Sequence, residues 1–272
     1  MTDLTLIKRD FVQALDCPDD KIDLTKATLI VARLEYPELE INHCLNTIEQ
    51  FIAQTQTRLS PTRYPLKIIR EINAVFFEEL RFRGNQENYY DPRNSFLNDV
   101  IERKLGIPIS LSILYLAIAK GINFPMVGIG MPGHFLIRPE FEEVGIFVDV
   151  FNRGEILFEQ DCQARLQELY QQPMVLEPHF LVPVSNRQIL TRMLTNLKFI
   201  YLNRQEYHKM LHIINFILLL LPNHPLELRD RGLLYYQLEN WQRASEDLRL
   251  YLALLPDAKD AGMIQEILQK IS

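Results

Sequence analysis

Two residues, His134 and Asp149, have the side chains that acid–base chemistry needs, and they stand fifteen positions apart. Around both of them apolar and polar residues alternate, a pattern that predicts two strands joined by a turn. If the turn centres near Phe141 and Glu142, His134 and Asp149 lie directly opposite each other, with Cβ atoms about 5 Å apart. The carboxylate would then orient the imidazole, as in a nucleophile–base–orienter triad. The same residues could equally form a buried polar pair that fixes the register of the strands.

The sequence holds three cysteines, and none precedes this hairpin at a place that suits such a triad. Cys44 stands beside His43, but adjacent residues of a helix point in different directions. Cys162 follows the hairpin and would give the order His, Asp, Cys along the chain. Unrelated folds use different orders, so the order alone does not exclude Cys162. A buried apolar thiol is nevertheless the usual role of such a cysteine.

Composition excludes several classes of function. The net charge of −6 argues against binding to nucleic acid, because phosphate contacts need clustered Lys and Arg. The odd number and wide spacing of the cysteines fit neither a disulfide framework nor a metal motif, and His208 and His212 lack the surrounding motif of a zinc helix. The first residues show no signal-peptide core, and no apolar run approaches the ~20 residues of a membrane helix. We therefore expect a cytoplasmic protein with no bound metal or cofactor.

The spacing of the apolar residues predicts the helices and strands that position His134 and Asp149. Residues 1–90 have apolar side chains at helical spacing and predict a helical region packed on the core. Residues 91–184 contain a short helix that ends at Gly106, a buried helix that opens at Pro108, and the strands of the hairpin. Residues 185–272 form a third, helical region.

The third region repeats itself at a period of 34 residues. The equivalent positions are Tyr201 and Tyr235, Tyr207 and Trp241, and Pro222 and Pro256. This period is typical of tetratricopeptide repeats, in which two helices form each repeat. Gly232 and Ala244 are the small residues where the paired helices meet, and Lys198 and Met210 stand at these places in the first copy. We predict about two repeats and a terminal helix.

The segment "YYDPRNSFLNDVIERKLGIPISLSILYLAIAKGINFPMVGIGMPGHFLIR", followed by "VDVFNRGEIL", resembles the transglutaminase-like core of the bacterial SirB-type family. That family joins this core to C-terminal tetratricopeptide repeats, and "EYPELEINHCLNTIEQFIA" resembles its leading helices. The resemblance covers most of the chain. It implies an α+β fold of the papain-like kind, with a helix packed against an antiparallel sheet.

The resemblance also assigns places to the site residues. Transglutaminase-like enzymes use a cysteine at the start of the central helix, with a histidine and an aspartate on neighbouring strands. By resemblance His134 and Asp149 occupy the last two places, and the cysteine place falls around Pro108 to Ser110. A helix N-terminus can lower the pKa of a thiol from ~8.5 to neutral or below, but it cannot ionise a serine. Ser110 would therefore need proton removal in concert with attack, or it simply caps the helix.

Two hypotheses follow for the function. The first is a non-catalytic protein-interaction or regulatory protein, whose repeats present a groove to a protein partner. The second is a hydrolase or acyl-transfer enzyme that uses Ser110, or Cys162, with His134 and Asp149. The sequence leaves the identity of the partner and the oligomeric state open.

Overall fold

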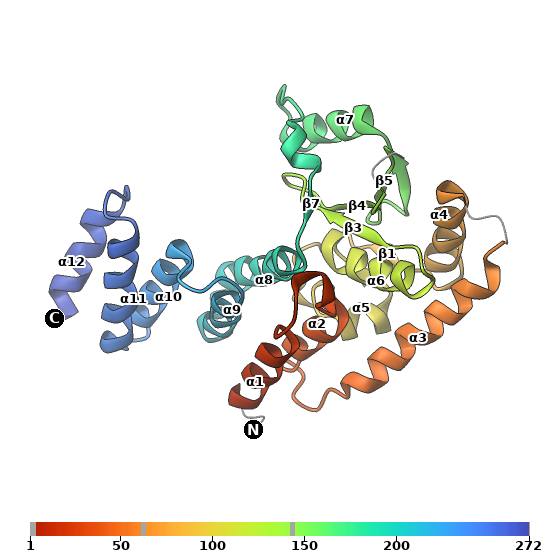
Figure 1. Ribbon diagram of the computed structural model, residues 1–272. Helices are drawn as coiled ribbons and strands as arrows, with labels where there is room; N and C mark the ends of the chain where they lie inside the picture. Colours follow the sequence, from red (N-terminus) through yellow and green to blue (C-terminus); the bar gives the residue numbers. More distant parts are fainter. Residues whose placement is uncertain (1–3, 61–63, 142–144, 272) are drawn as a thin grey trace. The chain divides into compact units, whose positions relative to one another are not determined.

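The computed structural model describes residues 4–60, 64–141 and 145–271 (Figure 1). Contacts divide the chain into two compact units, Met1–Met193 and Leu194–Ser272. The finer division at residues 90 and 184 stays a prediction. Within the three described ranges, no helix is both long and apolar enough to cross a membrane.

Helices make up the N-terminal half of the first unit, as the apolar spacing predicts. They are α1 (Leu4–Ala14), η1 (Asp19–Lys21), α2 (Leu24–Ala32), α3 (Ile41–Arg58), α4 (Pro65–Asn73), the π-helix η2 (Ala74–Glu79), η3 (Pro92–Asn94), α5 (Leu97–Arg103) and α6 (Pro108–Gly121). Pro108 is the first residue of α6, where its missing N–H costs no hydrogen bond. The side chains of α6 are buried almost all round, and the helix packs against β3 and β4 of the sheet (Figure 1). This is the helix-on-sheet arrangement that the family resemblance implies.

The main sheet has five antiparallel strands in the order β6-β5-β4-β3-β7. These strands are β3 (Met126–Ile129), β4 (Leu136–Pro139), β5 (Phe147–Asp149), β6 (Glu155–Leu157) and β7 (Pro183–Val184). Two shorter strands, β1 (Arg83–Gly84) and β2 (Leu105–Gly106), pair in parallel. After β6 the chain forms α7 (Glu159–Tyr170) and the short helix η5 (Pro178–Leu181) before it returns to the sheet as β7.

The second unit consists of repeat helices. Helix α8 (Asn186–Asn203) begins in the first unit, and α9 (Tyr207–Leu220), α10 (Pro225–Gln237), α11 (Trp241–Leu254) and α12 (Ala261–Ile271) follow. Helices α9 and α11 begin 34 residues apart (207 to 241) and also end 34 residues apart (220 to 254). A Cβ added at Gly232 would lie 2.8 Å from Leu248, so α10 and α11 can approach only because this residue is glycine. Two helix pairs and a terminal helix therefore match the predicted repeats.

Candidate functional site

The candidate site is a buried pair of polar side chains at the sheet. Nε2 of His134 lies 2.8 Å from Oδ2 of Asp149. His134 belongs to the turn that precedes β4, and Asp149 is the last residue of β5. Only 6% of His134 and none of Asp149 is exposed. The structure thus brings together the two residues that the sequence singles out.

The predicted register is wrong by two residues. Ile137 is paired with Val148, so Leu136, and not His134, stands opposite Asp149. Side chains alternate between the faces of a strand with a period of two, so a two-residue shift keeps the same side chains on the same face. The pair therefore forms between diagonal neighbours. The predicted turn centre includes Glu142, which lies outside the described residues.

The Asp149 carboxylate accepts hydrogen bonds from more groups than His134 alone. Its Oδ1 accepts from the backbone N–H groups of Phe151 and Asn152, each at 3.1 Å, and its Oδ2 accepts from Nδ2 of Asn152 at 2.8 Å. Burial opposes ionisation of this group, but the hydrogen bonds from His134 and Asn152 outweigh burial and hold the pKa of Asp149 below its usual value. The carboxylate is therefore an ionised orienter for the imidazole.

Hydrogen bonds that involve helices of the first unit hold the turn that follows Asp149. Gly154 has a φ of +71° and donates its N–H to the carbonyl oxygen of Asp149 at 2.9 Å. Nδ2 of Asn73 donates to the carbonyl oxygen of Gly154 at 2.8 Å. The hydroxyl of Tyr115, which is fully buried on α6, donates to Oδ1 of Asn73 at 2.9 Å. Asp149 is thus anchored through Asn73 to both α4 and α6.

The histidine side has an anchor that the sequence does not reveal. Nη2 of Arg192 donates to the carbonyl oxygen of His134 at 2.6 Å, and both Nη atoms donate to that of Met131 at 3.2 Å. The guanidinium also lies 5.5 Å from the centre of the Phe135 ring. Arg192 stands 58 residues after His134, on α8, and no local motif marks it.

Ser110 lies at the start of α6 as predicted, but its hydroxyl is already engaged. Its Oγ donates to the carbonyl oxygen of Asn94 at 2.5 Å and accepts from the backbone N–H of Ile107 at 3.1 Å. A serine hydroxyl has one proton to donate, and the acceptors within reach are the carbonyl oxygens of Asn94, at 2.5 Å, and of Ile107, at 3.2 Å. Ser110 is also fully buried. These bonds are those of a residue that closes the first turn of a helix.

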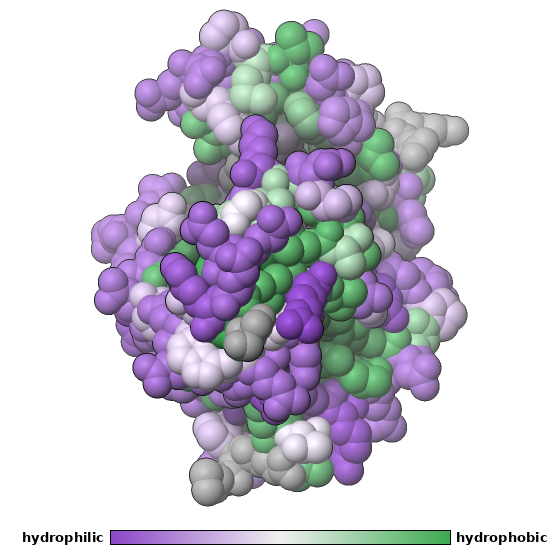
Figure 2. Space-filling model, turned by 90° about the vertical axis from the view of Figure 1, so that its left-hand side faces the viewer, coloured by the Kyte–Doolittle hydropathy of each residue, from purple (hydrophilic) through white to green (hydrophobic). Residues whose placement is uncertain are grey.

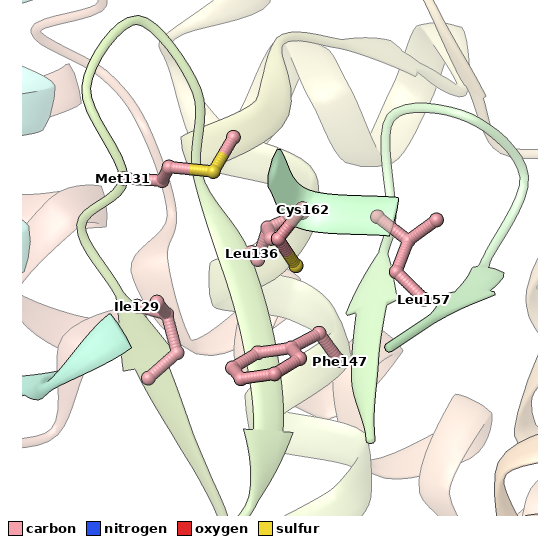
Figure 3. Packing of buried hydrophobic residues seen from close by; sticks show 6 residues of the cluster. All are labelled: Ile129, Met131, Leu136, Phe147, Leu157 and Cys162. Atoms are coloured by element: carbon pink, nitrogen blue, oxygen red, sulfur yellow. The ribbon is translucent and has the colours of Figure 1, made fainter. Parts of the chain in front are cut away.

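Cys162 is a core residue. It lies on α7 with no exposed surface, packed against an apolar cluster on one face of the sheet. Figure 3 shows its sulfur among Leu136, Phe147 and Leu157. Burial, with the nearby charges of Asp161 and Asp149, raises the pKa of Cys162 to about 12. Only the thiolate is strongly nucleophilic, so this protonated thiol is a poor nucleophile near neutral pH.

Cys44 is another buried thiol in the described part of the chain. Burial raises the pKa of the Cys44 thiol as well, and Cys44 lies inside α3. Across the same ranges, no three His, Cys, Asp or Glu side chains gather in a way that could hold a metal ion. The site therefore offers the His134 imidazole as a base and the Asp149 carboxylate as the group that orients it.

Comparison with known proteins agrees with the two-part architecture. Residues 42–195 match the family model of the transglutaminase-like superfamily, and residues 197–269 match that of a tetratricopeptide repeat. The boundary between the two matches falls close to Met193, where the contacts divide the chain. No solved structure matches the chain.

Relatives occur in bacteria and in animals. A UPF0162 protein of Xylella fastidiosa (strain 9a5c) is 34% identical over 260 residues, which cover 93% of this chain and 92% of that protein. A UPF0162 protein of Vibrio cholerae is 31% identical over 271 residues, covering 99% of this chain and 97% of that protein. The F-box only protein 21 of Mus musculus is 29% identical over 192 residues, covering 66% of this chain and 29% of that protein. These matches show that the chain belongs to the transglutaminase-like superfamily, with tetratricopeptide repeats after the core.

Proposed function

We propose that this protein is a non-catalytic interaction or regulatory protein, in which a transglutaminase-like core without a working nucleophile is joined to repeats that bind a protein partner. One observation carries the proposal: the acceptors within reach of the Ser110 hydroxyl proton are the backbone carbonyls of Asn94 and Ile107, and no hydrogen bond joins Ser110 to His134. A triad needs its nucleophile bonded to the base. His134 and Asp149 are then the retained half of a cysteine triad.

The competing function is a hydrolase or acyl transferase that uses Ser110 or Cys162. Both residues are fully buried, so substrate could reach neither without a rearrangement of α6 or α7. A rotation of the Ser110 hydroxyl toward His134 would also leave the carbonyl of Asn94 and the N–H of Ile107 without their bonds. Each buried polar group left unpaired costs about 1–3 kcal/mol. These costs weigh against the enzyme.

The repeats offer surface to a partner. Phe199 and Leu202 lie about one turn apart on α8 and are 52% and 42% exposed, and Leu226 is exposed at the start of α10. Figure 2 shows apolar surface bordered by hydrophilic side chains on the face turned to the viewer. Stacked helical repeats bind helices and extended peptides along such surfaces. We infer that a protein segment with apolar anchors binds here.

We place this activity in the cytoplasm. The three cysteines, Cys17, Cys44 and Cys162, are free thiols, a state that a reducing compartment maintains. The net charge of −6 supports a protein partner rather than nucleic acid.

The test uses the full-length chain as bait and captures its protein partner by chemical cross-linking. Two variants are compared with the wild type. Phe199→Glu combined with Leu202→Glu places charge on the exposed apolar surface of α8. Tyr64→Glu is the matched control, because Tyr64 is 68% exposed and belongs to the first unit. We expect a partner that the wild type and Tyr64→Glu retain and that the double variant loses by about tenfold or more. Equal retention by all three proteins would rule out the repeats as the binding element.

A further inference from the structure

Residues 85–94 lie between β1 and α5 and form a loop that its own side chains close. Nδ2 of Asn85 donates to Oδ1 of Asn94 at 3.0 Å, which joins the two ends of the loop. Nδ2 of Asn94 donates to the carbonyl oxygens of Asn88 at 2.7 Å and Tyr89 at 3.1 Å. Compact loops whose ends lie close together are packed by their own side chains and often carry function. We call residues 85–94 the strap.

The last residue of the strap lies on the place of the nucleophile. Oγ of Ser110 is 2.5 Å from the carbonyl oxygen of Asn94, and neither residue has any exposed surface. The hydrogen bonds inside the strap fix the residue that supplies this carbonyl. Any group that approaches Oγ of Ser110 along this direction has to displace the strap.

The middle of the strap lies on the turn that follows Asp149. The rings of Tyr89 and Phe151 meet edge to face, with their centres 5.9 Å apart. Phe151 in turn donates its backbone N–H to Oδ1 of Asp149 at 3.1 Å. A Cβ added at Gly84, directly before the strap, would lie 2.5 Å from the Phe151 ring, so the start of the strap approaches the same ring.

Tyr89 also lies near the residue that anchors the histidine. Burial raises the pKa of Tyr89, and the positive charge of Arg192 opposes that rise. Arg192 donates to the carbonyl oxygen of His134 at 2.6 Å. The strap thus borders all three places that the family resemblance assigns to a triad.

The outer side of the strap is open to solvent. Residues 86–88 are exposed, and Tyr90 is 66% exposed. Exposed loops open locally at a lower free energy than the core that they cover. The strap can therefore be displaced without unfolding of the unit.

We propose that the strap is an autoinhibitory contact that shields residue 110, so that a thiol restored there stays closed to reagents and substrates until the strap is displaced. The nucleophile place is then closed twice, by a serine where the family has a cysteine and by the strap. The inference deepens the proposed function and rests on it, because it explains how a core that keeps His134 and Asp149 stays inactive.

The test restores the thiol in the full-length chain with Ser110→Cys and follows alkylation by iodoacetamide, with each modified cysteine identified by peptide mass spectrometry. The natural cysteines are internal references, because Cys17 is half-buried whereas Cys44 and Cys162 are buried. With the strap intact, we expect the introduced thiol to react at least about tenfold more slowly than Cys17.

Two further substitutions release the strap at different points. Asn94→Ala removes the side chain that closes the loop, and Tyr89→Ala removes the contact with Phe151. Either one, combined with Ser110→Cys, should accelerate alkylation of the introduced thiol by about tenfold or more, while the two buried natural thiols stay slow.

Tyr90→Ala is the matched control. It removes the neighbouring, exposed tyrosine of the strap and leaves the contact between Tyr89 and Phe151 in place, so the introduced thiol should stay slow. If Asn94→Ala also exposes Cys44 and Cys162, the unit has unfolded and Tyr89→Ala alone decides.

Two results would overturn the inference. One is an introduced thiol that reacts as fast as Cys17 while the strap is intact, and the other is an unchanged rate in the release variants. Partner capture and the reactivity of Ser110 itself are measured on the wild-type core, so a failure of the proposed function is seen separately.

Discussion

At the scale of single residues, the Asp149 carboxylate is the most constrained group of the site. Four donors converge on it, namely Nε2 of His134, the N–H groups of Phe151 and Asn152, and Nδ2 of Asn152. The residue types, together with the alternation of side chains between the two faces of a strand, were enough to predict that Asp149 pairs with His134. The register was not predictable, since it depends on the length of a turn, and a shift of two residues leaves the pattern of faces unchanged.

Replacement of this carboxylate by an amide tests its electrostatic role. Asp149→Asn keeps the shape but presents an NH₂ group where four donors converge, so we expect a loss of about 2 kcal/mol in the free energy of unfolding at pH 7. Urea denaturation of the wild type and the variant measures the loss. The isosteric substitution avoids a cavity, so the change reports on charge and hydrogen bonding.

The loss should depend on pH in a defined direction. The folded pKa of Asp149 lies below the unfolded value of about 3.9, so its contribution is fully present above the unfolded pKa. As the pH falls through the folded pKa, the wild type protonates and that contribution disappears. The difference between wild type and Asp149→Asn should therefore shrink as the pH falls below about pH 4. A difference that stays constant down to about pH 3 would contradict this assignment.

At the scale of elements, a buried lysine replaces the glycine of the repeat pattern. Lys198 on α8 stands at the place of Gly232 on α10, 34 residues later. Its Nζ lies 2.6 Å from Oε1 of Glu227 and 3.1 Å from Oδ2 of Asp230, both on α10. The first repeat thus joins the second through an ion pair where a small residue would allow close packing. The other carboxylate oxygen of Glu227 has no hydrogen-bond partner.

A double-mutant cycle measures what this ion pair contributes. Lys198→Met leaves the buried Glu227 carboxylate without its closest cation, and we expect a loss of about 3 kcal/mol in the stability of the second unit. Adding Glu227→Leu removes the uncompensated charge and should restore most of that loss. The only tryptophan, Trp241, lies on α11, so its fluorescence during urea denaturation reports on this unit. Additive losses in the double variant would show that the two side chains do not interact.

Other elements differ in how far the sequence could reveal them. The 34-residue period predicted the repeat helices, because equivalent residues recur at fixed spacing. Strand β7 could not be predicted, since two residues are too short to show alternation. Arg192 could not be found by pattern either, because its acceptors are backbone carbonyls of Met131 and His134, which leave no trace in residue types.

At the scale of the whole molecule, a core with an oriented histidine precedes a helical array that offers exposed apolar side chains. We propose that this core has no working nucleophile. The cysteine place predicted by family resemblance falls near Ser110, and the sequence alone could not tell whether that hydroxyl was free. Its acceptor, the carbonyl of Asn94, lies 16 residues earlier in the chain and becomes visible only in the folded structure.

The most direct test of that claim is the intact mass of the full-length chain after incubation with a fluorophosphonate, which phosphonylates activated serines. We predict no adduct on the wild type under conditions that fully label a serine protease in the same buffer. An adduct on the wild type that disappears in both Ser110→Ala and His134→Ala would show a working triad and contradict the account.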